Sequence, residues 1–272
     1  MISVLNNVTS LVAENALSST QANLQNSLTE LSTGLKLNSG SQDPAAISIA
    51  DGLGANIAAL TQSSQNASNG VGLLQTADGA LSQVTNLLNQ AVTIATEAAN
   101  GGLTTAQATA ANTEFQSILS EITQIGSTTN FNGVAVFSAT AQTTFTSDGT
   151  SGGATTTSTT TGALSSTTLS LNSSTLTSTT SAATALTAVT AAIASVAATR
   201  GSIGASVQQL TADTNVENTE VSNLTSAQNN VQNADIGSTV ANMTQYNVLE
   251  QTGMAALSQS NAAEQNVLKL LQ

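Results

Sequence analysis

Residues 53–95 read LGANIAALTQSSQNASNGVGLLQTADGALSQVTNLLNQAVTIA, and apolar side chains recur along this stretch at alternating spacings of three and four residues. A spacing that averages about 3.5 residues keeps one helical face turned toward a partner over many turns. Residues 186–231 carry the same pattern, so we predict long coiled helices packed side by side within the subunit. The positions predicted to form this helix seam are Leu53, Ile57, Leu60, Leu74, Leu81 and Leu88 on the first helix, and Ile193, Val196, Ile203, Val207 and Leu210 on the second.

Polar residues interrupt both stripes. Arg200 occupies an apolar position of the second helix, where it either bridges to an acid on a neighbouring helix or extends along the surface with a solvated head. Asp78, Thr85 and Thr214 occupy similar positions, where polar side chains either specify the register of the helices or are tolerated near a boundary. The sequence leaves both alternatives open.

The two ends of the chain are also predicted to be helical, with apolar residues that wrap partly around each helix. Two helices alone cannot cover such surfaces, whereas a tube of repeated subunits can; the alternative is an intramolecular hairpin that shields its own apolar faces. The residues predicted to pack between subunits are Leu17, Leu24, Leu28, Leu31 and Leu35 near the N-terminus, and Val240, Met243, Met254, Leu257, Leu268 and Leu271 near the C-terminus.

The composition favours a helical bundle over a globular core. The 272 residues include one proline, no tryptophan, one tyrosine and four phenylalanines. A large globular core usually depends on aromatic side chains, whereas long helix pairs can be filled by Leu, Ile, Val and Ala. We therefore predict a mainly α fold: an elongated coiled-coil helical bundle built from both chain ends, with a small β-hairpin element and a short Thr/Ser-rich outer segment.

The charge argues against two classes of partner. Fifteen acidic residues face only Lys36, Arg200 and Lys269, which gives a net charge of -12. Proteins that bind phosphate backbones or anionic lipids need clustered basic side chains, so we expect neither nucleic acid nor a membrane as a partner.

No apolar run approaches the roughly 18 to 20 residues that span a bilayer. No signal peptide is recognisable, so secretion is expected to use another route.

Whole catalytic chemistries are missing from the sequence. The chain contains no histidine and no cysteine, so Ser-His-Asp or Cys-His catalysis, imidazole or thiolate metal sites and disulfides cannot form within one chain. The acidic residues are spread thinly and follow no metal-loop pattern. We expect no enzyme activity, no cofactor and no metal site.

The middle of the chain changes character. Asp43-Pro44 is a helix-start signal for the first long helix, and a shorter helix is predicted at residues 105–125. Asn132-Gly133 and Asp148-Gly149 are turn signals next to strand candidates at 134–137 and 143–146.

The segment that follows is predicted to be an outer one. Residues 138–183 are dominated by Thr, Ser, Gly and Ala. They are too poor in bulky side chains to build a core of their own, so a surface excursion held against the helices by a few leucines is expected.

Several motifs, in this order, resemble those of bacterial flagellins. Residues 31–38 (LSTGLKLN) resemble the L-S-S-G-x-R-I-N signature, and residues 42–46 (QDPAA) resemble D-D-P-A-G. One departure is Lys36, where the family has arginine, so a planar bidentate contact becomes a point charge. Further similar blocks are residues 66–70 (NASNG), 75–81 (QTADGAL), 129–133 (TNFNG), 200–205 (RGSIGA) and 267–271 (VLKLL).

The resemblance implies how the chain is divided. In this family the terminal helices line an inner tube, a middle helical domain surrounds it, and a variable part lies outside. The corresponding segments are 1–42 and 232–272 for the inner-tube domain, 43–137 and 184–231 for the middle helical domain, and 138–183 for a reduced variable surface segment with a β-hairpin.

The resemblance also implies a function. A flagellin is a structural subunit that self-polymerises into the extracellular bacterial flagellar filament for swimming motility. Its implied partners are other copies of itself, the type III flagellar export apparatus, a flagellin chaperone that holds the C-terminal helix, and the filament cap and hook-associated proteins. The first alternative is a hook-filament junction protein with the same terminal helices. A second is a secreted coiled-coil adhesin, for which the aromatic-poor middle offers no ligand surface.

Two further expectations follow from the resemblance. In the family, an arginine, a leucine and a glutamate on the long helices are recognised by an animal innate receptor, and the matching positions here are Gln90, Ile94 and Glu114. Because glutamine replaces the arginine, we predict weak recognition. The Thr/Ser-rich segment either carries O-linked sugars, as in some flagellins, or is a plain solvated linker.

Overall fold

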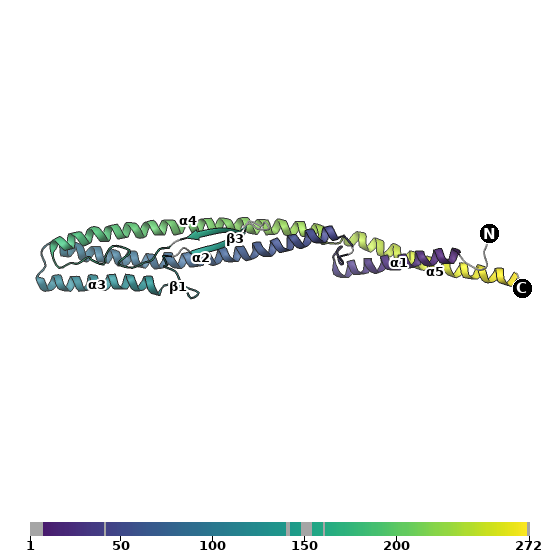
Figure 1. The fold of residues 1–272 in the computed structure, drawn as a ribbon, viewed down its shortest axis with the longest axis horizontal. Coiled ribbons are helices and arrows are strands. Elements are labelled where there is room, and N and C mark those ends of the chain that lie inside the picture. The colour runs from purple at the N-terminus through teal and green to yellow at the C-terminus, as the bar shows by residue number, and fades with distance from the viewer. Residues whose placement is uncertain (1–7, 41, 140–141, 148–153, 160, 271–272) are drawn as a thin grey trace. The chain divides into compact units, whose positions relative to one another are not determined.

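The computed structural model describes residues 8–40, 42–139, 142–147, 154–159 and 161–270. The chain forms two compact units: a terminal unit of residues 1–55 and 224–272, and a central unit of residues 56–223. Figure 1 shows the helices and strands along the chain. The helices are α1 (Val8–Thr33), α2 (Pro44–Ala99), α3 (Thr105–Thr128), α4 (Thr179–Gln232) and α5 (Ile236–Leu270), and the strands are β1 (Asn130–Phe131), β2 (Val134–Ala135), β3 (Gln142–Ser147) and β4 (Ala154–Thr159).

The fold is mainly α-helical with small antiparallel β-hairpins, which confirms the predicted fold class. Both long helices of the prediction are present, as α2 and α4. The helix-start signal of α2 is also confirmed, because the Asp43 carboxylate accepts hydrogen bonds from the backbone N–H groups of Ala45 at 3.1 Å and Ala46 at 3.0 Å. This contact satisfies two of the amides that a helix start leaves without partners.

The core of the central unit lies among α2, α3 and α4. Two apolar stripes of α2 contribute to it: Leu74, Leu81 and Leu88 of the predicted seam are buried, and so are Ala77 and Val84 on a second stripe. Burial on two stripes means that α2 packs against neighbours on two sides. The buried residues of the other two helices include Phe115, Ile118, Leu119 and Ile122 of α3, and Val189, Val196, Ile203 and Leu210 of α4.

The segment between the hairpins and α4 is held against the helices by a few leucines, as the sequence predicted. Leu164, Leu171 and Leu176 are all buried in the core of the central unit. The backbone of this segment is held on α3, since Gln116 Nε2 donates to the carbonyl of Ser174 at 2.8 Å. Its leucines follow no helical or strand period, so the pattern that marks a core element was absent from the sequence. In addition, α4 begins at Thr179, within the range expected to be surface segment.

The described part of the chain contains two antiparallel hairpins. The strand β1 pairs with β2 across Asn132 and Gly133, whose φ angles are 50° and 79°. Two consecutive left-handed residues are what a tight two-residue hairpin turn requires, and Asn-Gly adopts them readily. The strand β3 pairs with β4, the next strand along the chain. The turn expected at Asp148-Gly149 lies outside the described residues.

One described helix is long and apolar enough to cross a membrane by length and composition alone. An 18-residue window of α4 has a mean hydropathy of 1.6, and 28% of that window is buried within the protein. A core helix of a protein passes the same test, and α4 contributes Val189, Ala192 and Val196 to the core of the central unit. The hydropathy of α4 is therefore weak evidence for a membrane span.

Candidate assembly surface

The helices α1 and α5 run antiparallel in the terminal unit. Near one end of the pair, Thr9 Oγ1 and Ser260 Oγ are 3.0 Å apart. Further along, Gln21 Nε2 donates to Glu250 Oε1 at 3.2 Å. Past the end of α1, Leu35 and Asn233 form a backbone bridge in which Lys36 N donates to the Gln232 carbonyl at 2.7 Å and Ala234 N donates to the Gly34 carbonyl at 3.0 Å.

The large apolar side chains on the face that α1 and α5 share are at most half-buried in the described part of the pair. Within the described parts of the two helices, only Ser27 and Thr239 are buried, and both are polar. Gly253 of α5 faces Leu17 of α1, because a Cβ added at this glycine would lie 3.4 Å from Leu17 Cδ1. Fully burying one large aliphatic side chain stabilises a fold by roughly 1.5 to 3 kcal/mol. The described α1–α5 contact fully buries no large aliphatic side chain. Apolar burial therefore stabilises this helix pair only weakly.

The outward faces of these two helices carry apolar residues instead. Among the described residues, twelve large hydrophobic side chains are exposed, of which four belong to α1 and five to α5. Isolated exposed apolar residues are ordinary, but their concentration on one helix pair indicates an interaction surface. We call these nine residues the terminal apolar surface. They are Val8, Leu11, Val12 and Leu28 of α1, and Ile236, Val240, Val248, Leu249 and Met254 of α5.

The structure separates the residues predicted to pack between subunits into three groups. Residues of the first group are half-buried, and some of them lie on the face between α1 and α5. Residues of the second group are exposed, and the third group lies outside the described residues. Half-burial in a helix pair leaves part of each side chain available to a further partner. The half-buried residues are Leu17, Leu24, Leu31, Leu35, Met243 and Leu257, and the exposed ones are Leu28, Val240 and Met254. Leu271 and the side chain of Leu268 lie outside the described part of the chain.

Sequence reasoning missed several members of the terminal apolar surface. Leu11, Val248 and Leu249 were not among the predicted contact residues, yet 57%, 55% and 44% of their surfaces are exposed. The predicted contact residues were taken from the periodic apolar stripe of each helix. In the described pair, part of that stripe faces the other helix. For these three residues, the available signal was their displacement from the stripe.

The predicted intra-subunit seam residues are buried or half-buried without exception. Those that are fully buried belong to the central unit. The buried ones are Leu60, Leu74, Leu81, Leu88, Val196, Ile203 and Leu210, and the half-buried ones are Leu53, Ile57, Ile193 and Val207.

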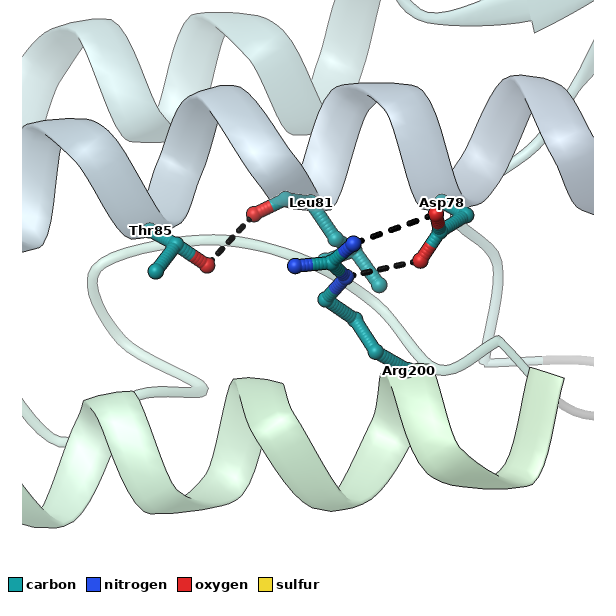
Figure 2. A network of polar contacts seen from close by, with 4 residues as sticks. All are labelled: Asp78, Leu81, Thr85 and Arg200. Atoms are coloured by element: carbon teal, nitrogen blue, oxygen red, sulfur yellow. Dashed lines mark hydrogen bonds and ion pairs between the residues drawn. The ribbon is translucent and has the colours of Figure 1, made fainter. Parts of the chain in front are cut away.

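Arg200 bridges α4 to α2. Its Nε donates to Asp78 Oδ1 at 2.7 Å and a second guanidinium nitrogen donates to Asp78 Oδ2 at 3.2 Å, the bidentate arrangement drawn in Figure 2. The hydrogen bond from Arg200 is the largest influence on the pKa of Asp78, which lies below its usual value although partial burial opposes the shift. Of the two alternatives left open by the sequence, the structure supports the ion pair.

Replacing Asp78 with asparagine is expected to make stability less dependent on pH in the acid range. A carboxyl whose pKa is lowered by folding stabilises the fold above its unfolded pKa, about 3.9 for aspartate, and this contribution disappears as the pH falls through the lower folded pKa. Both side chains are over a third exposed, so solvent screening limits the effect to about 0.5 kcal/mol. Urea unfolding of both proteins between pH 6 and pH 2 measures it. A stability difference that persists unchanged at pH 2 would contradict the assignment.

A second polar contact lies within the helix seam of the central unit. Ser63 Oγ of α2 donates to Glu217 Oε1 of α4, and both residues are buried. Next to them, Ser64 Oγ donates to Asn218 Oδ1 at 3.3 Å. Hydrogen-bonded polar layers in apolar helix seams favour one register over others. In the sequence, Glu217 falls on the apolar stripe of α4. Its partner was not apparent, because Ser63 lies one position off the apolar stripe of α2.

The positions matched to receptor recognition lie in the central unit. Gln90 of α2 and Glu114 of α3 are exposed, whereas Ile94 of α2 is half-buried against the core. Ile94 therefore offers only part of its side chain to a partner.

No described residues suggest a chemical site. Within the ranges that the structure describes, no group of three or more Asp or Glu residues could hold a metal ion. The prominent feature is a helical protein whose chain ends present apolar surface, which is the class of a structural, assembly-forming protein.

Comparisons with known proteins agree with this class. Residues 4–142 match the bacterial flagellin N-terminal helical region, and residues 186–271 match the bacterial flagellin C-terminal helical region. The chain belongs to the bacterial flagellin family, whose members assemble into a homopolymeric filament and are structural proteins, not enzymes.

Individual relatives show the same resemblance over part of their length. The chain is 37% identical over 139 residues to flagellin 1 of Proteus mirabilis, covering 51% of this chain and 38% of that one. It is 40% identical over 139 residues to a flagellin of Serratia marcescens, covering 51% and 40%. The matches thus span about two fifths of these relatives. A crystal structure of Bacillus cereus flagellin aligns with a TM-score of 0.49 at 25% identity, covering 56% of this chain and 88% of that one.

Proposed function

We propose that this chain is a subunit that polymerises with copies of itself into the bacterial flagellar filament, an extracellular appendage used for swimming. The proposal rests on one observation about the terminal unit. The described α1–α5 pair has no fully buried apolar side chain, and nine of its large apolar side chains are exposed. The family assembles into homopolymers, so the occupant that this surface fits best is another copy of the chain.

The proposed mechanism couples ordering of the terminal helices to assembly. A helix pair without a sufficient apolar contact gains little from folding alone, because the entropy of ordering each residue opposes it. Neighbouring copies that cover the terminal apolar surface supply the missing burial. The filament then works through stiffness and shape, and the core of the central unit keeps each subunit folded.

The remaining partners belong to the same proposal. A filament subunit must leave the cell, so we assign export to the flagellar type III apparatus and protection of α5 before export to a flagellin chaperone. The filament cap and the hook-associated proteins are the proposed contacts at the two ends of the polymer. At Gln90, Ile94 and Glu114 we propose weak recognition by the animal innate receptor, because Gln90 lacks the charge of an arginine.

A hook-filament junction protein is the second candidate, because similar terminal helices would serve it equally. Seeded growth separates the two. Purified chain added to short filament seeds should extend them without limit if the chain is a filament subunit. Addition of a single terminal layer, followed by arrest at any protein concentration, would favour the junction protein.

Replacing Leu249 with aspartate is expected to block assembly while leaving the single chain folded. The side chain is 44% exposed in the single chain, so the substitution costs little there, but assembly would bury a carboxylate. We expect the critical concentration for polymerisation to rise at least tenfold, roughly the effect of one poorly satisfied buried polar group. Sedimentation of the polymer measures it, and Leu249→Met is the matched control. Equal critical concentrations for the aspartate and methionine variants would remove Leu249 from the interface.

A further inference from the structure

Two methionines on α5 differ in their surroundings. Met254 is 50% exposed, whereas Met243 is half-buried. Gly253, the residue before Met254, faces Leu17 of α1. At 100° per residue this orientation turns Met254 away from the centre of the α1–α5 contact. The same geometry places Met254 on one face of α5 with Ile236 and Val240, which are also exposed and lie about five and four turns away, and with the half-buried Met243 about three turns away.

We propose that Met254 is an oxidation site whose modification controls whether the subunit can assemble. The inference rests on the proposed filament function, because it requires the terminal apolar surface to become covered by another copy. In the single chain half of the Met254 surface is exposed, so a peroxide can reach the side chain. In the polymer the same side chain is covered and protected.

The chemistry needs a peroxide or hypohalous acid from the surroundings. With hydrogen peroxide, the thioether sulfur attacks one peroxide oxygen, the O–O bond breaks, and an S–O bond forms. The sulfur loses two electrons, and the departing hydroxide takes up a proton to become water. The product, methionine sulfoxide, is polar where the thioether was apolar, and methionine sulfoxide reductases reverse the change.

The sulfoxide hinders assembly for a physical reason. In the free chain its S=O group is hydrated, so the modification alters the folded single chain little. Assembly would transfer that group from water into an apolar contact, which is unfavourable unless a hydrogen-bond donor is supplied. Oxidation therefore weakens association and leaves the central unit intact.

Peroxide treatment of the dilute full-length chain, followed by polymerisation, tests the proposal. Cleavage after glutamate releases Met254 in residues 251–264 and Met243 in residues 221–250, so the two can be measured separately by mass. We expect Met254 to oxidise several-fold faster than Met243 in the dilute chain, and this preference to vanish in the polymer. The critical concentration should rise by roughly tenfold after oxidation, and treatment with both sulfoxide reductases should restore it.

Substitutions assign the effect to one residue. Met254→Leu should assemble normally and resist peroxide, whereas Met243→Leu should remain as sensitive as the unmodified chain. Met254→Gln, which resembles the sulfoxide in polarity, should assemble as poorly as the oxidised chain. If Met254→Leu loses assembly after peroxide to the same extent as the unmodified chain, the inference is overturned. If the untreated chain forms no filaments, the proposed function itself fails, and the two failures are thereby distinguished.

Discussion

Deletion of residues 232–272 is expected to leave a folded central unit that forms no filaments. The deletion removes α5, and with it five of the nine residues of the terminal apolar surface and the antiparallel partner of α1. The core of the central unit, built from α2, α3 and α4, lies wholly outside the deleted segment. Assembly should be lost at every concentration, while the cooperative unfolding of the remaining helices persists.

Two measurements check this result. Negative-stain microscopy after salt-induced polymerisation reports assembly, and thermal unfolding followed by circular dichroism reports the central unit. The full-length chain taken through the same preparation is the control. Filaments of normal appearance from the truncated chain would refute the assignment of assembly to the terminal helices.

Replacing Gly126 with alanine is expected to destabilise the central unit by about 2 kcal/mol or more. A Cβ at this buried position of α3 would lie 1.9 Å from the carbonyl oxygen of Leu164 and 2.8 Å from its carbonyl carbon. Neither is a flexible side-chain atom, so the segment that carries Leu164 must move and its contact with the core must loosen.

The helical glycine Gly79 supplies a matched control. A Cβ there meets nothing within 4 Å, and alanine is a better helix former than glycine, so Gly79→Ala should stabilise by roughly 0.5 to 1 kcal/mol. Urea unfolding of the two variants should give free-energy changes of opposite sign. A neutral Gly126→Ala would mean that the Leu164 segment is not held against α3 as the structure has it.

The sequence predicted the long helices because their pattern is strong and local. The 3-4 spacing around Leu74, Leu81 and Leu88 is a property of the helix itself, and burial of these residues requires only a partner with the same spacing. The Asp43 cap was predictable for the same reason, since its acceptor and the amides that it binds are neighbours in the chain.

Other features depend on contacts between distant residues and left no local signal. Leu164, Leu171 and Leu176 were expected to hold their segment against the helices, but the sequence did not show that they join the core formed by α2, α3 and α4. Ser63 and Glu217 are 154 positions apart, and a serine among many serines does not reveal its partner.

The candidate assembly surface was predictable in part. Apolar residues that wrap around both terminal helices indicated more than one partner, but the pattern could not tell which of them face α1 or α5 and which remain exposed. Leu17 and Leu249 illustrate the problem: both are leucines on terminal helices, yet Leu17 faces Gly253 and Leu249 is open to solvent. Only the relative rotation of the two helices decides between these outcomes.

Hydrogen exchange of α1 and α5 in the dilute chain and in the assembled polymer tests the central claim most directly. If copies of the chain must cover the terminal apolar surface, amides of residues 8–33 and 236–270 should exchange rapidly in the dilute chain and slow by roughly a hundredfold or more on assembly. Amides of α2 and α3 in the central unit should be protected in both states. Terminal helices that are as strongly protected in the dilute chain as the core of the central unit would contradict the account.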